Sequence, residues 1–452
     1  MLQSLVIPAL GTLQHELHTT QSTATWVLTA YLLSSSIFAP IMGRIGDMIG
    51  KERVLVTALV FMATGSLLGA LAPSIGVMIA ARVIQGISGG VLPLGFGIIR
   101  DEFPKTNVAG AVGALNALGT GAAGLGLVLA GPIQDLLGYR WLFWLPMILA
   151  IIAAGLVMLF VPESPVRSPG RISVLPAIFL GGWLLAFLVA LSEAPKLGWS
   201  SGKILGLVAT AVVLAVGWVA SEKRAATPLI DMNMMRRRAV WTNNLVALLA
   251  GVAMFGMAFL PQFVQTPKHA GYGFGASVSA SGLMLVPWNV ASFAVGMSSG
   301  RLARKVSGKL RVIVGCVIGS AAMAFLAFEH EHQWQIYATT AVMGAGLGMI
   351  NAAVAALIVA GVPPAQTGAA SGMNANIRTI GGSFGTAMMA TIVSSRLRSD
   401  GLPEEAGYTA GFAMLAAALG LAALAGLLIP VLKRPASTAD ESIAIGASTP
   451  VL

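Results

Sequence analysis

The chain has 452 residues, of which 56% are hydrophobic and only 10% are charged, with a net charge of +10. Soluble proteins carry charge on about 25% of their residues, so this composition argues against a soluble enzyme, a nucleic-acid binder and a secreted disulfide scaffold. The mean hydropathy of +0.83 instead predicts an all-α, multi-pass membrane protein. The single cysteine, Cys316, permits no internal disulfide.

Apolar runs bounded by charges and turn residues predict thirteen membrane-spanning helices. In chain order they lie near 24–42, 54–72, 75–99, 108–133, 141–161, 173–192, 203–220, 240–264, 277–298, 311–328, 335–360, 369–394 and 408–432. The preceding stretch MLQSLVIPALG is apolar but reaches across only about half of a bilayer. We therefore expect about 14 spans with an incomplete first helix, and interpret the start at Met1 as misassigned or truncated by about 10 to 20 residues.

The Lys and Arg residues are distributed unevenly between alternate loops. Taking the loop with Arg44 as one side, 19 of the 27 cations lie on that side, six lie on the other, and Arg82 and Arg378 lie within spans. By the positive-inside rule this side is cytoplasmic. An even number of spans then places both termini in the cytoplasm, and the location expected is the cell (plasma) membrane.

An internal repeat divides the chain. GRIGDMIGKERVL at 43–55 is echoed by GRLARKVSGKLRVI at 300–313, and matches such as Pro104 with Pro363 share nearly the same offset. The repeat predicts two six-helix bundles with two additional helices between them. The expected parts are an N-terminal bundle at 1–161, inserted helices with their flanking loops at 162–238, a C-terminal bundle at 239–432 and a cytoplasmic tail at 433–452. This plan is usual for secondary transporters.

The segment GRIGDMIGKER between the first two full spans is the candidate gate. It is predicted as a tight loop in which Asp47 pairs with a cation or with a helix N-terminus of the other half, and so holds the cytoplasmic side shut in one state. The alternative is a basic loop that only sets orientation. The candidate gating residues are Gly43, Arg44, Gly46, Asp47, Gly50, Lys51 and Arg53.

Arg82 is the first candidate for proton coupling. An arginine inside a span costs at least about 2.5 to 3.5 kcal/mol, so we expect it to face the bundle interior with a partner, one helical turn from Gln85. The alternative is a structural arginine that ties two helices through carbonyl groups. None of the 17 acidic residues lies in the middle of a span, so coupling depends either on a rim carboxylate, with Asp135 as the second candidate, or on an acid upstream of Met1.

Polar and aromatic side chains within the spans are candidates for lining a substrate cavity. They are Tyr31, Gln85, Asn116, Asn243, Asn244, Gln262, Gln265, Trp288, Asn289, Asn351, Asn374, Asn376 and Arg378. Neutral polarity combined with 21 methionines suits bulky apolar or cationic substrates. The alternative for each amide, and for Arg378, is a bond to a neighbouring helix.

Three weak signals do not support a cofactor site. GTGAAG at 119–124 matches a dinucleotide pattern but follows no strand, HEH at 330–332 has no second ligand cluster, and no Walker motif occurs. We expect no metal, no nucleotide, no nucleic acid and no cofactor. The expected partners are a small-molecule substrate, protons and the lipid bilayer, with the proton gradient as the energy source.

The chain resembles the major facilitator superfamily, specifically its fourteen-helix drug:proton antiporter branch, over nearly its whole length. The family's signature after the second helix is resembled by GRIGDMIGKER, and its signature in the fourth helix by ARVIQGISGG at 81–90. Three further stretches are similar to stretches of the fourteen-helix branch: LSEAPKLGW, the stretch from Glu222 to RAATPLIDM, and GAASGMNANIRTIGGSFG. The resemblance implies multidrug efflux in exchange for protons, with the Asp47 segment as the gate and Arg82 in coupling.

Two departures from the family pattern bear on coupling. The antiporter signature of the fifth helix falls on Gly126, Leu127, Ala130 and Gly131, with Gly-Leu in place of Gly-Pro. The acidic residue usual upstream of a segment like SLVIPAL is absent.

The leading hypothesis is a proton-coupled exporter of drugs or other hydrophobic or cationic small molecules that works by alternating access. One alternative is a dedicated exporter of a single natural product or metabolite. From other classes, a non-transporting sensor or scaffold would need a soluble domain that the short tail does not offer, and an intramembrane enzyme would need buried reactive groups that are not visible.

Overall fold

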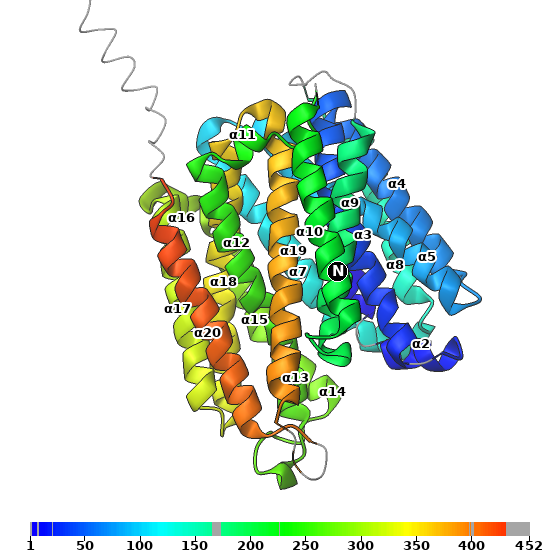
Figure 1. Cartoon of the computed structure of the whole chain (residues 1–452), viewed down its shortest axis with the longest axis vertical. Helices are drawn as coiled ribbons and strands as arrows, with labels where there is room; N and C mark the ends of the chain where they lie inside the picture. Colours follow the sequence, from blue (N-terminus) through cyan, green and yellow to red (C-terminus); the bar gives the residue numbers. More distant parts are fainter. Residues whose placement is uncertain are drawn as a thin grey trace, which may run out of the picture.

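The computed structural model describes residues 2–6, 9–19, 21–164, 173–225, 227–396, 398 and 402–430. These residues form a bundle of long helices (Figure 1). Twelve helical segments within the described ranges are long and apolar enough to cross a membrane, so the predicted all-α multi-pass class is confirmed, although fewer spans qualify than the 14 expected. The expected tail at 433–452, like Arg167 and Arg171, lies outside the described residues.

The N-terminal half runs from α1 to α8. Its helices are α1 (Leu2–Val6), α2 (Leu10–Glu16), α3 (Gln21–Ile49), α4 (Lys51–Ala70), α5 (Ile75–Gly86), the 3-10 helix η1 (Ile87–Gly90), α6 (Val91–Glu102), α7 (Lys105–Leu137) and α8 (Trp141–Phe160). The predicted span 75–99 is thus three consecutive segments, interrupted where the sequence ISGG brings two glycines together.

Two inserted helices and a connector follow. They are α9 (Val174–Leu197), α10 (Gly202–Arg224) and the short α11 (Met232–Met235). We call residues 227–237, which lead from α10 to the next long helix, the connector.

The C-terminal half runs from α12 to α20. Its helices are α12 (Arg238–Gly256), η2 (Met257–Phe259), α13 (Leu260–Gln265), η3 (Lys268–Ala270), α14 (Val278–Leu283), α15 (Val286–Met297), α16 (Ser299–Lys305), α17 (Gly308–Phe328), α18 (Gln333–Gly361), η4 (Pro364–Gln366), α19 (Thr367–Ser394) and α20 (Glu405–Leu427). Pro261 and Pro287 lie in the first turns of α13 and α15, where the missing backbone N–H of proline costs least. The predicted single spans 240–264 and 277–298 are each broken into separate helices just before these prolines.

The two ends of the bundle differ in charge. Residues 43–53, 100–105, 222–225, 227–238 and 300–311 lie at one end, the upper end in Figure 1, and carry most of the Lys and Arg residues. We call it the basic end. The opposite end carries the turns after α7 and α9, the segment 266–277 and the loop at 329–332.

The apolar core joins the inserted helices to the C-terminal half. A single buried cluster combines Leu184 of α9, Trp218 of α10 and Ile230 of the connector with residues of α12, α17, α18 and α20. Smaller clusters fill the N-terminal half. The inserted helices therefore share a core with the C-terminal half, and α9 packs against both α19 and α3. Across the interface between the halves, α3, α6 and α7 face α15, α16, α18 and α19.

Candidate functional site

The segment 43–53 is mostly helical. Helix α3 continues to Ile49 and α4 begins at Lys51, so Gly50, with φ of 127°, is the only residue between them. The prediction of an eleven-residue loop was wrong because Gly43 and Gly46 are helical residues that permit close packing. A side chain on Gly43 would overlap the backbone of Gly368 in α19. The bundle thus brings α3 of one half against α19 of the other.

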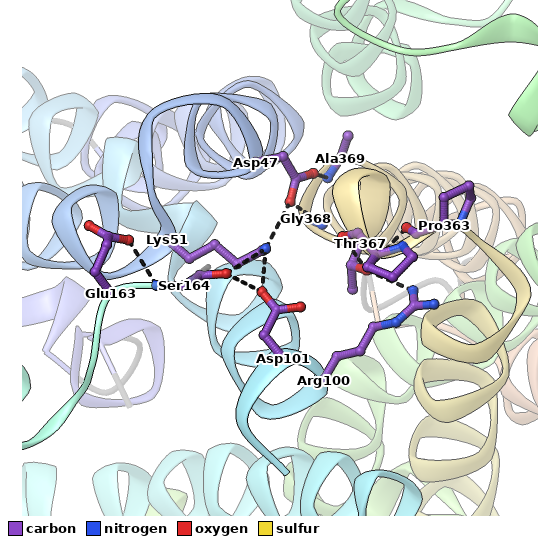
Figure 2. A network of polar contacts seen from close by, with 11 residues as sticks. Asp47, Lys51, Arg100, Asp101, Glu163, Ser164, Pro363, Thr367, Gly368 and Ala369 are labelled. Atoms are coloured by element: carbon purple, nitrogen blue, oxygen red, sulfur yellow. Dashed lines mark hydrogen bonds and ion pairs between the residues drawn. The ribbon is translucent and has the colours of Figure 1, made fainter. Parts of the chain in front are cut away.

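Asp47 uses this close approach to cap α19. Its carboxylate is fully buried and accepts hydrogen bonds from the backbone N–H groups of Gly368, at 3.2 Å, and Ala369, at 3.0 Å (Figure 2). Amides in the first turn of a helix have no intrahelical acceptor and carry the positive end of the helix dipole. The structure thus gives Asp47 the predicted helix N-terminus of the other half as its hydrogen-bond partner, and the cation near it, Lys51, belongs to its own half.

Lys51 lies between two carboxylates. Its ammonium group is 2.6 Å from Asp101 Oδ2 and 3.7 Å from Asp47 Oδ1, and none of the three side chains is more than 1% exposed. Ser164 accepts from Lys51 Nζ at 3.3 Å and donates to Asp101. Two buried carboxylates share one lysine, with the charges of Arg44 and Arg100 also close enough to act on Asp47, and the amides of α19 add hydrogen bonds to the Asp47 carboxylate.

Arg100 makes a second contact between the halves. Its guanidinium donates to Thr367 Oγ1 at 2.7 Å and to the carbonyl of Val362 at 2.6 Å. The ion pair of Arg53 with Glu163, at 3.3 Å, joins two parts of the N-terminal half; since Arg53 is 67% exposed, it contributes little. Figure 2 shows the Arg100 and Asp47 contacts converging on the start of α19.

The sequence did not identify Arg100, Asp101, Ser164 or Thr367 as members of this site. Lys51 is among the predicted gating residues, whereas Arg100 contributed only to the predicted topology, since charged residues at the end of a span ordinarily face water. A signal existed in the adjacent pair Arg100–Asp101, because an acid and a base side by side at a helix end can serve two different partners.

Arg82 is completely buried among α3, α4 and α5. Its Nε donates to the carbonyl of Val27 at 3.0 Å, its Nη1 donates to Gln85 Oε1 at 2.7 Å, and its guanidinium carbon lies 4.8 Å from the ring centre of Tyr31. Gln85 continues the chain of contacts by donating to Ser66 in α4 at 2.7 Å. Within the described residues Nη2 has no hydrogen-bond partner. Arg82 has neutral partners, and its charge is stabilised by a carbonyl, an amide and an aromatic face.

Several predicted cavity residues bond within the protein instead. Gln85 is fully buried in the Arg82 contacts, and Asn374 donates to Asn244 at 2.8 Å, tying α19 to α12. In this structure these three amides bond other polar groups of the protein, and their part in lining a cavity stays a prediction. An amide in a membrane span gains from pairing with another polar group, and sequence does not tell which neighbour is available.

The remaining lining candidates have varied surroundings. Asn243 and Asn376 are buried, Gln265 donates to Ser281 at 2.8 Å, and Gln262 is exposed. Half-buried positions on helices that face the other half are held by Tyr31, Asn116, Trp288, Asn289, Asn351 and Arg378. These six are the polar and aromatic candidates that still fit a path between the halves.

The stretch aligned with an antiporter signature lies in α7. Ala130 is buried in a cluster with Leu5 of α1, while Gly126 is buried and Gly131 is half-buried. Asp135, about one turn beyond Gly131 in α7, is exposed at the opposite end of the bundle. The structure therefore separates Asp135 from Arg82, which lies on another helix and inside the N-terminal half.

Replacing Gly43 with Ala tests the close approach of α3 and α19. The added methyl group would overlap the Gly368 carbonyl, and overpacking of this kind costs about 1–3 kcal/mol. With Cys316 replaced by Ala, a cysteine at Ala369 should react with a maleimide about tenfold faster in the Gly43→Ala variant. Gly76→Ala, where an added Cβ has no neighbour within 4 Å, is the matched control. An unchanged rate for Gly43→Ala would argue against tight helix contact.

Comparisons with known proteins agree with this arrangement. The family model described as Major Facilitator Superfamily matches residues 1–386. The chain is 27% identical over 380 residues to the multidrug transporter protein MdtP of Bacillus subtilis, covering 83% of this chain and 69% of that protein. It is 26% identical over 408 residues to the tetracenomycin C resistance and export protein of Streptomyces glaucescens, covering 89% and 74% of the two chains.

A solved structure has the same fold. The human organic anion transporter MFSD10 superimposes with a TM-score of 0.64 at 16% identity, over 95% of this chain and 89% of that one.

Proposed function

Because the chain belongs to the Major Facilitator Superfamily, we propose that it is a proton-coupled exporter of drugs or other hydrophobic or cationic small molecules. Membership of this transporter family makes it a multi-pass membrane transporter that carries a small-molecule substrate, and not an enzyme. The names of relatives such as MdtP and the tetracenomycin C export protein support the substrate class. The energy source is the proton gradient, without a bound cofactor.

The observation that carries the mechanism is the capping of α19 by Asp47. A carboxylate on one half bonds two backbone amides of the other, and Arg100 adds bonds to the same region. In the proposed cycle these contacts hold the halves together at the basic end and separate when that end opens. Opening has to admit water, because an isolated buried carboxylate would be costly.

The proposed orientation puts the basic end in the cytoplasm. Its excess of Lys and Arg supports this through the positive-inside rule. Both termini are then cytoplasmic, and the gate formed by Asp47 closes the pathway on the cytoplasmic side.

Arg82 is proposed to take part in proton coupling. It is buried, it contacts α3 and, through Gln85, α4, and its contacts are all with neutral groups. A change in its hydrogen bonding would therefore alter contacts among α3, α4 and α5. Asp135 remains the second candidate, at the opposite end, where it is accessible to protons from that side.

A dedicated exporter of one natural product is the second candidate function. Relatives named as a tetracenomycin C export protein and a probable actinorhodin transporter support it. Efflux assays with a panel of unrelated hydrophobic cations separate the two, since a dedicated exporter would move one compound class only.

The test of the proposed function is substrate efflux from proteoliposomes with and without a pH gradient. We expect a gradient, acidic on the side that receives the substrate, to accelerate uphill efflux, and a protonophore to abolish it. Efflux at the same rate with and without the gradient would rule out proton coupling.

A further inference from the structure

The connector between the inserted helices and the C-terminal half is bonded at its start to both inserted helices. Glu222 in the last turn of α10 is 2% exposed and accepts from the backbone N–H groups of Leu229, at 2.8 Å, and Ile230, at 3.2 Å. The indole of Trp218 donates to the same carboxylate at 3.1 Å. At the start of α9, Ser173 donates to the carbonyl of Thr227 at 2.9 Å. The connector is therefore a fixed part of the inserted unit.

The connector is hydrogen-bonded to the start of α19, the helix whose first amides bind Asp47. Asp231 Oδ1 caps α11 by accepting from Asn233 N at 2.8 Å, and its Oδ2 accepts from Gln366 Nε2 at 3.3 Å. Gln366 is the N-cap residue of α19. It is followed at once by Thr367, which accepts from Arg100, and by the two residues whose amides bind Asp47.

A small cavity lies where the connector meets the gate. Its volume is about 210 Å³, and it is lined by Arg44, Pro228, Leu229, Asp231, Met234, Gln366 and Ala369. Residues of α3, the connector and α19 thus meet around one partly polar space. Around this cavity the connector reaches α19 through a polar contact, the bond between Asp231 and Gln366. A change in the connector can therefore alter the position of the first turn of α19.

We propose that the inserted helices help to close the gate through the connector. Asp231 and Gln366 act as positioning residues that orient the first turn of α19 toward Asp47, and Glu222 anchors the connector to α10. This inference rests on the proposed gate. It gives the inserted pair a role in transport besides occupying membrane between the two halves. Loss of the connector contacts should loosen the start of α19 even when Asp47 is intact.

Hydrogen–deuterium exchange over residues 364–371 in the full-length protein tests this proposal. In Gln366→Met, which keeps the side-chain length but removes the bond to Asp231, exchange at the Gly368 and Ala369 amides should be about fivefold faster, as expected for one lost net hydrogen bond. Glu222→Gln, which cannot accept all three donors, should raise exchange at residues 229–230 and at 364–371 together. Efflux should fall in both variants.

Two further variants control this experiment. Gln134→Met removes a comparable 2.7 Å bond to Thr12 at the opposite end and should leave exchange over 364–371 unchanged. The double variant Asp231→Asn with Gln366→Glu reverses donor and acceptor while keeping the net charge, so it should restore slow exchange and efflux. A merely structural effect of Gln366→Met would not be rescued in this way.

The outcomes separate this inference from the gate itself. Asp47→Asn should also accelerate exchange at Gly368 and Ala369, because it removes part of their acceptor. If Asp47→Asn does so but Gln366→Met and Glu222→Gln do not, the connector proposal is overturned and the gate stands. If Asp47→Asn leaves exchange unchanged, the gate fails, and the connector proposal fails with it.

Discussion

Asp47→Asn is expected to open the basic end and to reduce gradient-driven efflux strongly. An asparagine has one acceptor oxygen for the two α19 amides and no charge to oppose Lys51. Hydrogen bonds to charged groups contribute about 1.5–3 kcal/mol, so the ratio of closed to open molecules should fall about tenfold or more. Efflux in proteoliposomes and maleimide labelling of a cysteine at Ala369 measure the two effects.

Glu52→Gln provides the control for Asp47→Asn. Glu52 lies in the same segment and is also an acid, but no hydrogen bond or ion pair is seen for it within the described ranges. We expect near-normal efflux and labelling for Glu52→Gln. Equal losses in the two variants would mean that the segment needs negative charge in general and not the cap on α19.

Arg82→Ala should abolish coupling and lower the stability of the N-terminal half. The change removes bonds to Val27 and Gln85 and the contact with Tyr31, and two bonds from a charged donor contribute about 3 kcal/mol or more. We expect a lower unfolding temperature in detergent, and no acceleration of efflux by a pH gradient. Thermal unfolding and efflux with and without the gradient check both results.

Arg82→Lys and Arg140→Ala help to separate coupling from stability. Lysine keeps the positive charge but lacks the planar guanidinium that donates to several acceptors at once. Compared with Arg82→Ala, we therefore expect Arg82→Lys to recover part of the stability while coupling stays impaired. Arg140 is exposed and has a cation–π contact with Tyr139 at 5.9 Å, so Arg140→Ala should affect neither property. A purely structural role for Arg82 predicts instead that efflux per folded molecule still responds to the gradient.

Much of the fold could be predicted because lipid imposes a simple rule on sequence. Spans need long apolar runs, and α4, α8, α10 and α17 lie close to their predicted ranges. Predictions were weaker where polar or small residues interrupt the runs. Glycines at Gly43 and Gly46 suggested a loop, although inside a helix they serve close packing.

The site was predictable only in part, because its chemistry depends on packing between distant segments. Asp47 could be expected to meet a helix N-terminus, but nothing local identifies α19, which begins 320 residues later in the chain at Thr367. The burial of Lys51 and the amide pair of Asn244 and Asn374 likewise follow from contacts between helices. A polar residue within a span predicts that it has a hydrogen-bonding partner, but only the three-dimensional structure identifies that partner.

The claim that Asp47 closes the basic end is tested most directly by a distance measurement between the halves. Spin labels can replace Thr106 at the start of α7 and Lys305 at the end of α16, two exposed positions, in a protein whose only native cysteine, Cys316, is changed to Ala. Pulsed electron spin resonance should give mainly a short distance with Asp47 present and a substantial second population at longer distance in Asp47→Asn. The same single short distance in both proteins would contradict the account.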